Sequence, residues 1–196
     1  MADAERGRLV VISGPSGAGK TTVVRDVFAG APVPLVPSIS ATTRAPRPGE
    51  VDGVAYHFLS SEEFANRRKR GEFLECFEVF GRGEWYGTLL AEVTPSLEAG
   101  KWVLLEIDVQ GALSVVERFP DAITIFLQPP SLDVLEKRLR GRRTESEEAI
   151  QRRLAQARHE LELAPCYRYQ VTNEEDAPHR AAQQICEILK RERRLN

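Results

Sequence analysis

The chain has 196 residues, with 27 lysines and arginines against 29 aspartates and glutamates, so its formal net charge is −2 at pH 7. This length suggests one compact unit and excludes several folding domains. Hydrophobic residues make up 42% and charged residues 29%, which is typical of a soluble globular protein and excludes a disordered chain. No apolar run approaches the roughly 20 residues of a membrane helix, and the near-neutral charge offers no general attraction for nucleic acid. The acidic, polar N-terminus is unlike a secretory signal. We therefore expect a cytoplasmic protein that binds neither membranes nor nucleic acid.

The sequence offers no pattern for a disulfide framework or a resident metal site. Its three cysteines and three histidines are widely spaced, without the C-x-x-C pair or ligand spacing of a zinc site. They are Cys76, Cys166 and Cys186, and His57, His159 and His179. We expect any metal ion to arrive with a substrate.

The beginning and the second half of the chain alternate between predicted strands and helices. Aliphatic and β-branched runs predict strands at residues 8–13, 102–107, 123–127 and 169–173. Helical spacing of apolar residues predicts helices at residues 21–29, 109–118 and 177–194, and along the stripes Leu132, Leu135, Leu139 and Ile150, Leu154, Ala157, Leu161. Continuous apolar strands that alternate with helices predict an α/β fold with a parallel sheet.

Residues 30–100 have a different pattern. Prolines and glycines separate short apolar runs such as residues 54–58 and 73–80. Ser60 and Glu63 form an S-x-x-E capping box, which predicts the start of one helix. We interpret this segment as short antiparallel strands with one helix, inserted into the parallel-sheet core.

Residues 14–21 match the phosphate-binding pattern G-x-x-x-x-G-K-[ST], and they lie directly between a predicted strand and a predicted helix. Glycines let backbone N–H groups curl around phosphate oxygens, and the helix adds the positive end of its dipole. Lys20 would contact the outer phosphates, and the Thr21 hydroxyl would bind the Mg²⁺ that accompanies ATP. The alternative is a turn that only joins strand to helix. The predicted ATP-binding residues are Gly14, Pro15, Ser16, Gly17, Ala18, Gly19, Lys20, Thr21 and Thr22.

A second candidate anion site follows in a proline-stiffened loop. Arg44 and Arg47 lie three residues apart, with Tyr56 nearby. Fixed guanidinium groups can hold a phosphate bidentately, although a solvated surface loop is the alternative for such a pair.

Several segments together resemble guanylate kinase, in sequence and in order, over nearly the whole chain. They are residues 14–22, residues 40–56, Glu75 followed by W-Y-G-T at 85–88, L-E-I-D-V-Q-G at 105–111 and R-L-R-G-R at 138–142. The resemblance implies transfer of the γ-phosphoryl group of ATP to GMP, and to dGMP, with Mg²⁺. It also implies a P-loop NTPase-type parallel sheet flanked by helices, formed by residues 1–36 and 97–196. A small GMP-binding β domain at residues 37–96 and a helical lid at about 130–155 would complete the fold.

The resemblance also assigns the GMP site. It places phosphate contacts on Arg44, Arg47, Tyr56 and Tyr86, guanine contacts on Ser40, Glu75 and Thr88, and a substrate contact on Asp108. An ionised carboxylate such as Glu75 can accept hydrogen bonds from both N1–H and the 2-amino group of guanine, whereas adenine has neither donor. The alternatives are a strand-edge charge facing water for Glu75 and a helix cap for Asp108.

The resemblance places lid arginines at Arg138, Arg142 and Arg153, which with Lys20 and Arg44 form the expected catalytic set. Such arginines would neutralise charge on the migrating phosphoryl group, although solvated charges paired with Glu136 or Glu148 are the alternative. Arg143 departs from the family pattern, which commonly has glycine there. A second hypothesis for the whole chain is a non-catalytic guanylate-kinase-like interaction module, and a third is a kinase for another monophosphate.

Overall fold

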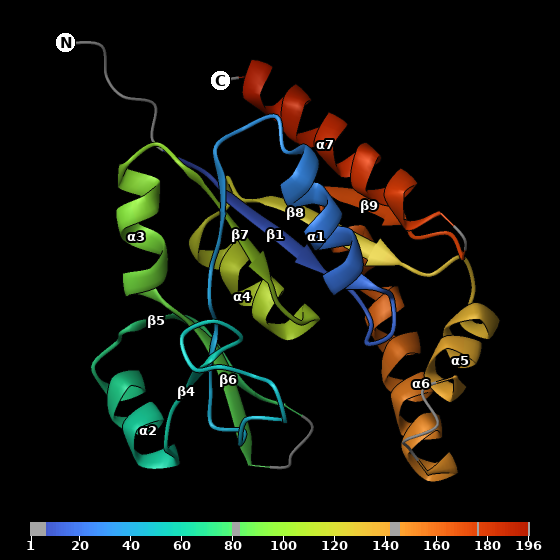
Figure 1. Ribbon diagram of the computed structural model, residues 1–196, viewed down its shortest axis with the longest axis horizontal. Coiled ribbons are helices and arrows are strands. Elements are labelled where there is room, and N and C mark those ends of the chain that lie inside the picture. The colour runs from blue at the N-terminus through green and yellow to red at the C-terminus, as the bar shows by residue number, and fades with distance from the viewer. Residues whose placement is uncertain (1–6, 80–82, 142–145, 176, 196) are drawn as a thin grey trace.

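The computed structural model describes residues 7–79, 83–141, 146–175 and 177–195, and it contains a parallel sheet and a smaller second sheet (Figure 1). The parallel sheet has the strand order β2-β7-β1-β8-β9. Its strands are β1 (Leu9–Ser13), β2 (Leu35–Pro37), β7 (Trp102–Glu106), β8 (Ile123–Gln128) and β9 (Tyr169–Thr172). The predicted α/β fold with a parallel sheet is confirmed.

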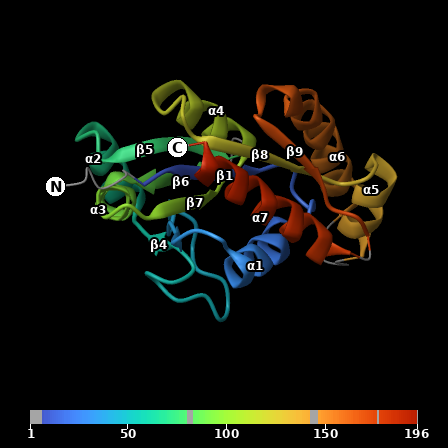
Figure 2. The same ribbon diagram turned by 90° about the horizontal axis from the view of Figure 1, so that it is seen from above.

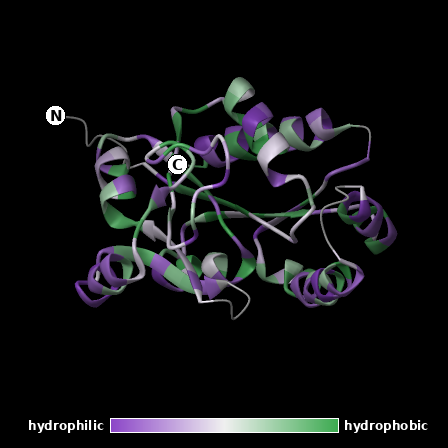
Figure 3. Cartoon of the chain, turned by 60° about the horizontal axis from the view of Figure 1, so that its bottom comes forward, coloured by the Kyte–Doolittle hydropathy of each residue, from purple (hydrophilic) through white to green (hydrophobic). Residues whose placement is uncertain are grey.

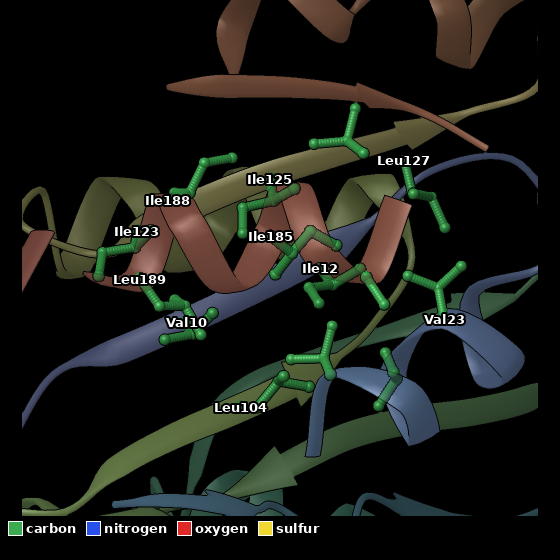
Figure 4. Close-up of a cluster of buried hydrophobic side chains, with 14 of the residues drawn as sticks. Val10, Ile12, Val23, Leu104, Ile123, Ile125, Leu127, Ile185, Ile188 and Leu189 are labelled. Atoms are coloured by element: carbon green, nitrogen blue, oxygen red, sulfur yellow. The ribbon is translucent and has the colours of Figure 1, made fainter. Parts of the chain in front are cut away.

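Helices cover both faces of this sheet because its strands carry apolar side chains on both sides (Figure 2). Val10 and Ile12 of β1 pack with helices α1 (Lys20–Gly30) and α7 (Pro178–Arg194), in the cluster drawn in Figure 4. Leu9 and Val11 point the opposite way, toward α3 (Leu90–Glu98) and α4 (Val109–Arg118). The alternation follows from the two-residue repeat of a strand.

The remaining helices of the core are α5 (Leu132–Arg140), α6 (Glu147–Glu162) and the short 3₁₀ helix η1 (Ala164–Cys166). The two predicted apolar stripes meet between α5 and α6, where Leu135, Leu139, Ile150 and Leu154 are buried. In Figure 3 the helices alternate between purple and green along their length, as amphipathic helices should. None of the helices in the described ranges is long and apolar enough to cross a membrane.

The small sheet has the order β4-β3-β6-β5, made of β3 (Ala41–Thr42), β4 (His57–Phe58), β5 (Phe73–Val79) and β6 (Glu84–Leu89). Helix α2 (Ser61–Lys69) begins as the capping box predicts, because the Ser60 hydroxyl accepts a hydrogen bond from the Glu63 N–H at 3.1 Å. Phe64 of α2 stacks on Phe73 and closes a small separate core.

The prediction for residues 30–100 is wrong in three respects. Strand β2 belongs to the parallel sheet, β3 pairs parallel with β4, and a second helix, α3, is present. Pro37 is accommodated because β2 is an edge strand. Pro95 lies inside α3, and burial of Val93 and Leu97 against β7 stabilises a helix that the proline would otherwise interrupt.

The buried carboxylate of Glu192 connects α7 to the parallel sheet. Glu192 is 0% exposed and forms ion pairs with Arg8 at 2.9 Å and with Arg168 at 3.0 Å, and it also accepts a hydrogen bond from the Tyr169 hydroxyl. Removing its charge would leave two guanidinium groups without their common partner.

Glu192→Gln is therefore expected to lower the free energy of unfolding by about 2 kcal/mol, which corresponds to a fall in melting temperature of roughly 4–8 °C. Glu187→Gln on the same helix is the control, because Glu187 is 74% exposed and should change stability by less than about 0.5 kcal/mol. Thermal unfolding by circular dichroism measures both, and equal melting temperatures for the two variants would contradict the prediction.

Candidate active site

The glycine-rich loop joins β1 to α1 in a shape that requires glycine at positions such as Gly14 and Gly19. Gly14 and Gly19 have φ angles of 142° and 88°. A Cβ atom on Gly14 would lie 2.0 Å from the Leu127 carbonyl oxygen, and one on Gly19 would lie 2.5 Å from the Asn173 side-chain nitrogen. The loop therefore packs tightly against the ends of β8 and β9, and it leads into the N-terminus of an eleven-residue helix, which favours anions.

Lys20 is the first residue of α1, and its ammonium folds back over the loop. Its Nζ donates to the carbonyl oxygens of Gly14 at 2.7 Å and Pro15 at 3.3 Å. Burial lowers the pKa of Lys20, while the nearby carboxylates of Glu106, Glu160 and Asp108 act in the opposite direction. The ammonium is thus held against the first two residues of the loop.

Thr21 lies beside an acidic strand end. Its Oγ1 donates to Glu106 Oε1 at 2.8 Å, and Glu106 is paired in register with Ile12 of the adjacent β1. The carboxyl ends of β1 and β7 therefore bring a hydroxyl and a carboxylate together next to the loop. Among the described residues there is no cluster of three or more His, Cys, Asp or Glu side chains that could hold a metal ion by themselves.

Two of the three predicted lid arginines reach the loop. Arg138 of α5 donates to the Asn173 carbonyl at 3.0 Å and to the Ala18 carbonyl at 3.4 Å, and Arg153 of α6 donates to the Ser16 hydroxyl. Arg142 lies outside the described residues, as does Arg143. Arg140, which was not predicted as a lid residue, pairs with the surface carboxylates of Glu136 and Glu147.

Asn173, at the end of β9, organises this side of the loop and was not singled out from the sequence. It is 4% exposed, and its side-chain nitrogen donates to the Ala18 carbonyl at 2.7 Å. Its polar type at a strand end was the available signal, but its partner lies 155 residues earlier in the chain.

The second candidate anion site brings together three of its four predicted residues. Arg44 Nε donates to the Tyr86 hydroxyl at 3.1 Å, and its guanidinium lies 5.4 Å from the centre of the Tyr56 ring. Glu50, not predicted, accepts from Arg44 at 2.9 Å and from the Arg47 backbone N–H at 2.6 Å. These hydrogen bonds lower the pKa of Glu50. Arg47 is exposed, and its side chain is not part of this cluster.

Glu75 lies on β5 directly opposite Thr88 of β6, and it does not face water. It is 5% exposed, and its Oε1 accepts a hydrogen bond from Thr88 Oγ1 at 2.6 Å. Its other oxygen, Oε2, is buried without a hydrogen-bond partner among the described residues. Burial raises the pKa of Glu75 to about 7, and the negative charge of Asp108 adds to the rise. A buried oxygen without a donor is suited to a ligand that brings one.

Asp108 caps α4, as one of the two interpretations predicted. Its Oδ1 accepts the Gly111 N–H at 2.8 Å. Burial raises the pKa of Asp108 to about 6, and Glu160 of α6 contributes to the rise, whereas Lys20 lowers it. Glu160 is 8% exposed and was missed, because nothing in a polar helix distinguishes it from its exposed neighbours.

Two other predicted residues lie close to these elements. Ser40 is half-buried just before β3, and its carbonyl accepts the His57 N–H at 2.9 Å, while Thr22 is exposed on the first turn of α1. In Figure 1 the small sheet lies on one side of the carboxyl ends of β1 and β7, and the α5–α6 pair lies on the other. The glycine-rich loop is between them, so a ligand on the loop would have the buried Glu75 carboxylate on one side and arginines on the other.

Comparison with known proteins identifies one family. A family model described as guanylate kinase matches residues 6–192. The chain is 52% identical to guanylate kinase from Rhodopirellula baltica, covering 95% of this chain and 88% of that one, and 49% identical to guanylate kinase from Rubrobacter xylanophilus, covering 95% of both. The crystal structure of guanylate kinase from Anaplasma phagocytophilum superposes with a TM-score of 0.78 at 33% identity, covering 96% of this chain and 87% of that one.

Proposed function

Because the chain belongs to the guanylate kinase family and transfers a phosphoryl group from ATP to GMP, we propose that residues 14–22 hold ATP and that the small sheet holds GMP. The core then comprises residues 1–36 and 97–196, residues 37–96 form the GMP-binding unit, and about residues 130–155 form a lid. The observation that carries the GMP assignment is the buried Glu75 carboxylate, one oxygen of which has no hydrogen-bond partner within the described ranges.

At the ATP end, the backbone N–H groups of the loop and the N-terminus of α1 bind the phosphates. Lys20 exchanges the carbonyls of Gly14 and Pro15 for the outer phosphate oxygens. Arg138 and Arg153, whose guanidinium groups already contact the loop, neutralise charge that spreads over the migrating phosphoryl group, and Arg142 completes this set.

Mg²⁺ bound with ATP fits the donor set beside the loop. The Thr21 hydroxyl and the Glu106 carboxylate are hard oxygen donors 2.8 Å apart, and Mg²⁺ needs only one or two protein oxygens besides phosphate and water. Thr21 would ligate the ion and Glu106 would orient the hydroxyl or a bound water. When present, the ion supplies charge neutralisation at the phosphates.

At the GMP end, the phosphate is bound by Arg44, Arg47, Tyr56 and Tyr86. Glu50 keeps the Arg44 guanidinium in place. Glu75, Thr88 and Ser40 bind the base, and Asp108 contacts the nucleotide from the end of β7. Guanine presents N1–H and the 2-amino group side by side, so Glu75 can accept from both. Adenine would place a lone pair against the carboxylate, and AMP is therefore rejected.

The reaction needs alignment rather than a protein base. An oxygen of the GMP phosphate attacks the γ-phosphorus of ATP as the bond from that phosphorus to the β–γ bridging oxygen breaks, which yields GDP and ADP. The acceptor phosphate is already anionic near neutral pH, so positioning by Arg44 and the loop can suffice. Closure of the lid would exclude water and prevent wasteful hydrolysis of ATP.

The substrate assignment is tested with purified protein, Mg²⁺ and ATP in an assay coupled to ADP release. We expect GMP to be phosphorylated with kcat/KM at least about 10³-fold higher than AMP, CMP or UMP, and dGMP to be accepted. Chelation by EDTA should abolish turnover, and added Mg²⁺ should restore it. Equal rates with the four ribonucleotides would contradict the role of Glu75, and GMP binding without turnover would favour the non-catalytic interaction module.

A further inference from the structure

The backbone of helix α4 packs against the Glu75 carboxylate at Gly111, which has no side chain. Gly111 is buried in the first turn of α4. A Cβ atom on Gly111 would lie 2.9 Å from Glu75 Oε2 and 2.8 Å from Phe77 Cε1, both closer than real Cβ atoms come to other heavy atoms. The close approach of α4 to the Glu75 carboxylate is therefore possible only because residue 111 is glycine.

The Glu75 oxygen that faces Gly111 is the buried one that lacks a hydrogen-bond partner among the described residues. Oε1 of Glu75 is tethered by Thr88 at 2.6 Å, whereas Oε2 has no hydrogen-bond partner in the described parts of the chain. A carboxylate that accepts two parallel hydrogen bonds from one base edge must keep both oxygens in the plane of that base. A displacement that rotates Oε2 away from Gly111 would break this alignment and leave Oε1 tethered.

Helix α4 is held in place by its own contacts, so it cannot easily move away from Glu75. The Gly111 N–H is held by Asp108 Oδ1 at 2.8 Å, and the flanking Val109 and Ala112 are 1% and 0% exposed in the core of the parallel sheet. Glu75, in contrast, carries its carboxylate at the end of a side chain with rotatable bonds. An added methyl group would therefore move the carboxylate rather than the helix.

We propose that Gly111 is a specificity-determining residue, whose missing side chain lets the Glu75 carboxylate take the position that reads guanine. The proposal rests on the proposed function of Glu75. Alanine is the better helix former, so the cost of Gly111→Ala comes from the two contacts of its Cβ, with Glu75 Oε2 at a flexible side-chain end and with Phe77 Cε1. The proposal assigns the loss of specificity to the first contact, and a double-mutant cycle separates it from the second.

The test compares GMP with IMP, whose base keeps N1–H but lacks the 2-amino group. We expect Gly111→Ala to lower kcat/KM for GMP at least tenfold and to lower the GMP-to-IMP ratio by a similar factor, mainly through KM for the monophosphate. The KM for ATP and the circular dichroism spectrum should stay unchanged. Gly30→Ala is the matched control, because its Cβ would meet only Cys186 Sγ at an ordinary 3.6 Å.

A double-mutant cycle with Glu75→Ala separates the possible causes. Once the carboxylate is absent, Gly111→Ala should have less than a twofold further effect, whereas a continued loss would assign the effect to Phe77 and overturn the proposal. The proposal would also be overturned if Gly111→Ala left the ratio of kcat/KM for GMP to that for IMP unchanged while Glu75→Ala abolished the preference for GMP. In that case the role of Glu75 would stand. A ratio retained in Glu75→Ala would instead defeat the proposed function.

The cycle also covers a failure to fold. If Gly111→Ala is unfolded but the double variant folds, the clash with Glu75 disrupts the fold instead of moving the carboxylate, and the proposal is wrong. If neither folds, Gly111 is required by the fold itself and the proposal is wrong.

Discussion

Replacing Lys20 with alanine is expected to lower kcat by about 10³-fold or more while the protein still folds. The ammonium is held over the loop by the Gly14 and Pro15 carbonyls before any substrate binds, so its charge needs no reorganisation during the reaction. Burial lowers its pKa, which means that the fold gains no net stability from ionising this group, and its removal should not destabilise the protein.

Turnover at saturating ATP and GMP, measured by coupled ADP release, and the melting temperature together test this prediction. Lys190→Ala is the control, since Lys190 is 49% exposed on α7, far along the chain from the loop. A Lys20→Ala enzyme with more than a tenth of the wild-type kcat would show that the ammonium does not stabilise the transition state. A large fall in melting temperature would show that the lysine is needed for folding.

Elements with a local signal could be predicted from the sequence, and those that depend on distant partners could not. The helix predicted at residues 109–118 is α4, because its apolar residues have helical spacing and Asp108 supplies an N-cap. Strand β2, in contrast, is three residues long and exists only because β7, more than sixty residues later, offers a free edge. Pro95 gave a signal against α3 that tertiary packing overrides.

The candidate site follows the same division. The residues of the glycine-rich loop could be named from the sequence, because their pattern fixes both the backbone shape and the chemistry. Four other residues could not be named from the sequence, because each is defined by an interaction with a particular residue elsewhere in the fold. They are Glu50, Asn173, Glu160 and Gly111. For Glu75, the sequence could suggest a base contact by resemblance but not the burial that raises its pKa.

Glu75→Gln is expected to lower kcat/KM for GMP by about 10²–10³-fold and, at the same time, to stabilise the free protein above pH 7. The amide keeps one acceptor for the base but turns an N–H₂ group toward the other donor of guanine. Glu78→Gln on the same strand is the control, because Glu78 is exposed and should change kcat/KM for GMP by less than twofold.

The pH dependence of both effects follows from the raised pKa. Protonation of Glu75 below about pH 7 removes one acceptor, so GMP affinity of the wild type should fall about tenfold between pH 8 and pH 6 through this group, in addition to the titration of the GMP phosphate itself. In Glu75→Gln only the phosphate titration should remain. Calorimetric GMP titrations at several pH values measure the difference, and parallel pH profiles would contradict the assignment.

Stability should respond with the opposite sign, because the folded protein binds this proton more tightly than the unfolded chain does. The contribution of Glu75 to the free energy of unfolding is fully present below about pH 4.5 and is lost as the pH rises through about 7. Because the pKa rises from 4.5 in the unfolded chain to about 7 in the folded protein, the free energy of unfolding falls by up to about 3 kcal/mol over this pH range. Asp108, with its pKa raised to about 6, acts in the same direction in both proteins. Glu75→Gln should therefore melt several degrees higher than the wild type at pH 8 and at nearly the same temperature at pH 5. A variant that loses GMP selectivity without this gain would show that Glu75 reads the base but is not desolvated in the free enzyme.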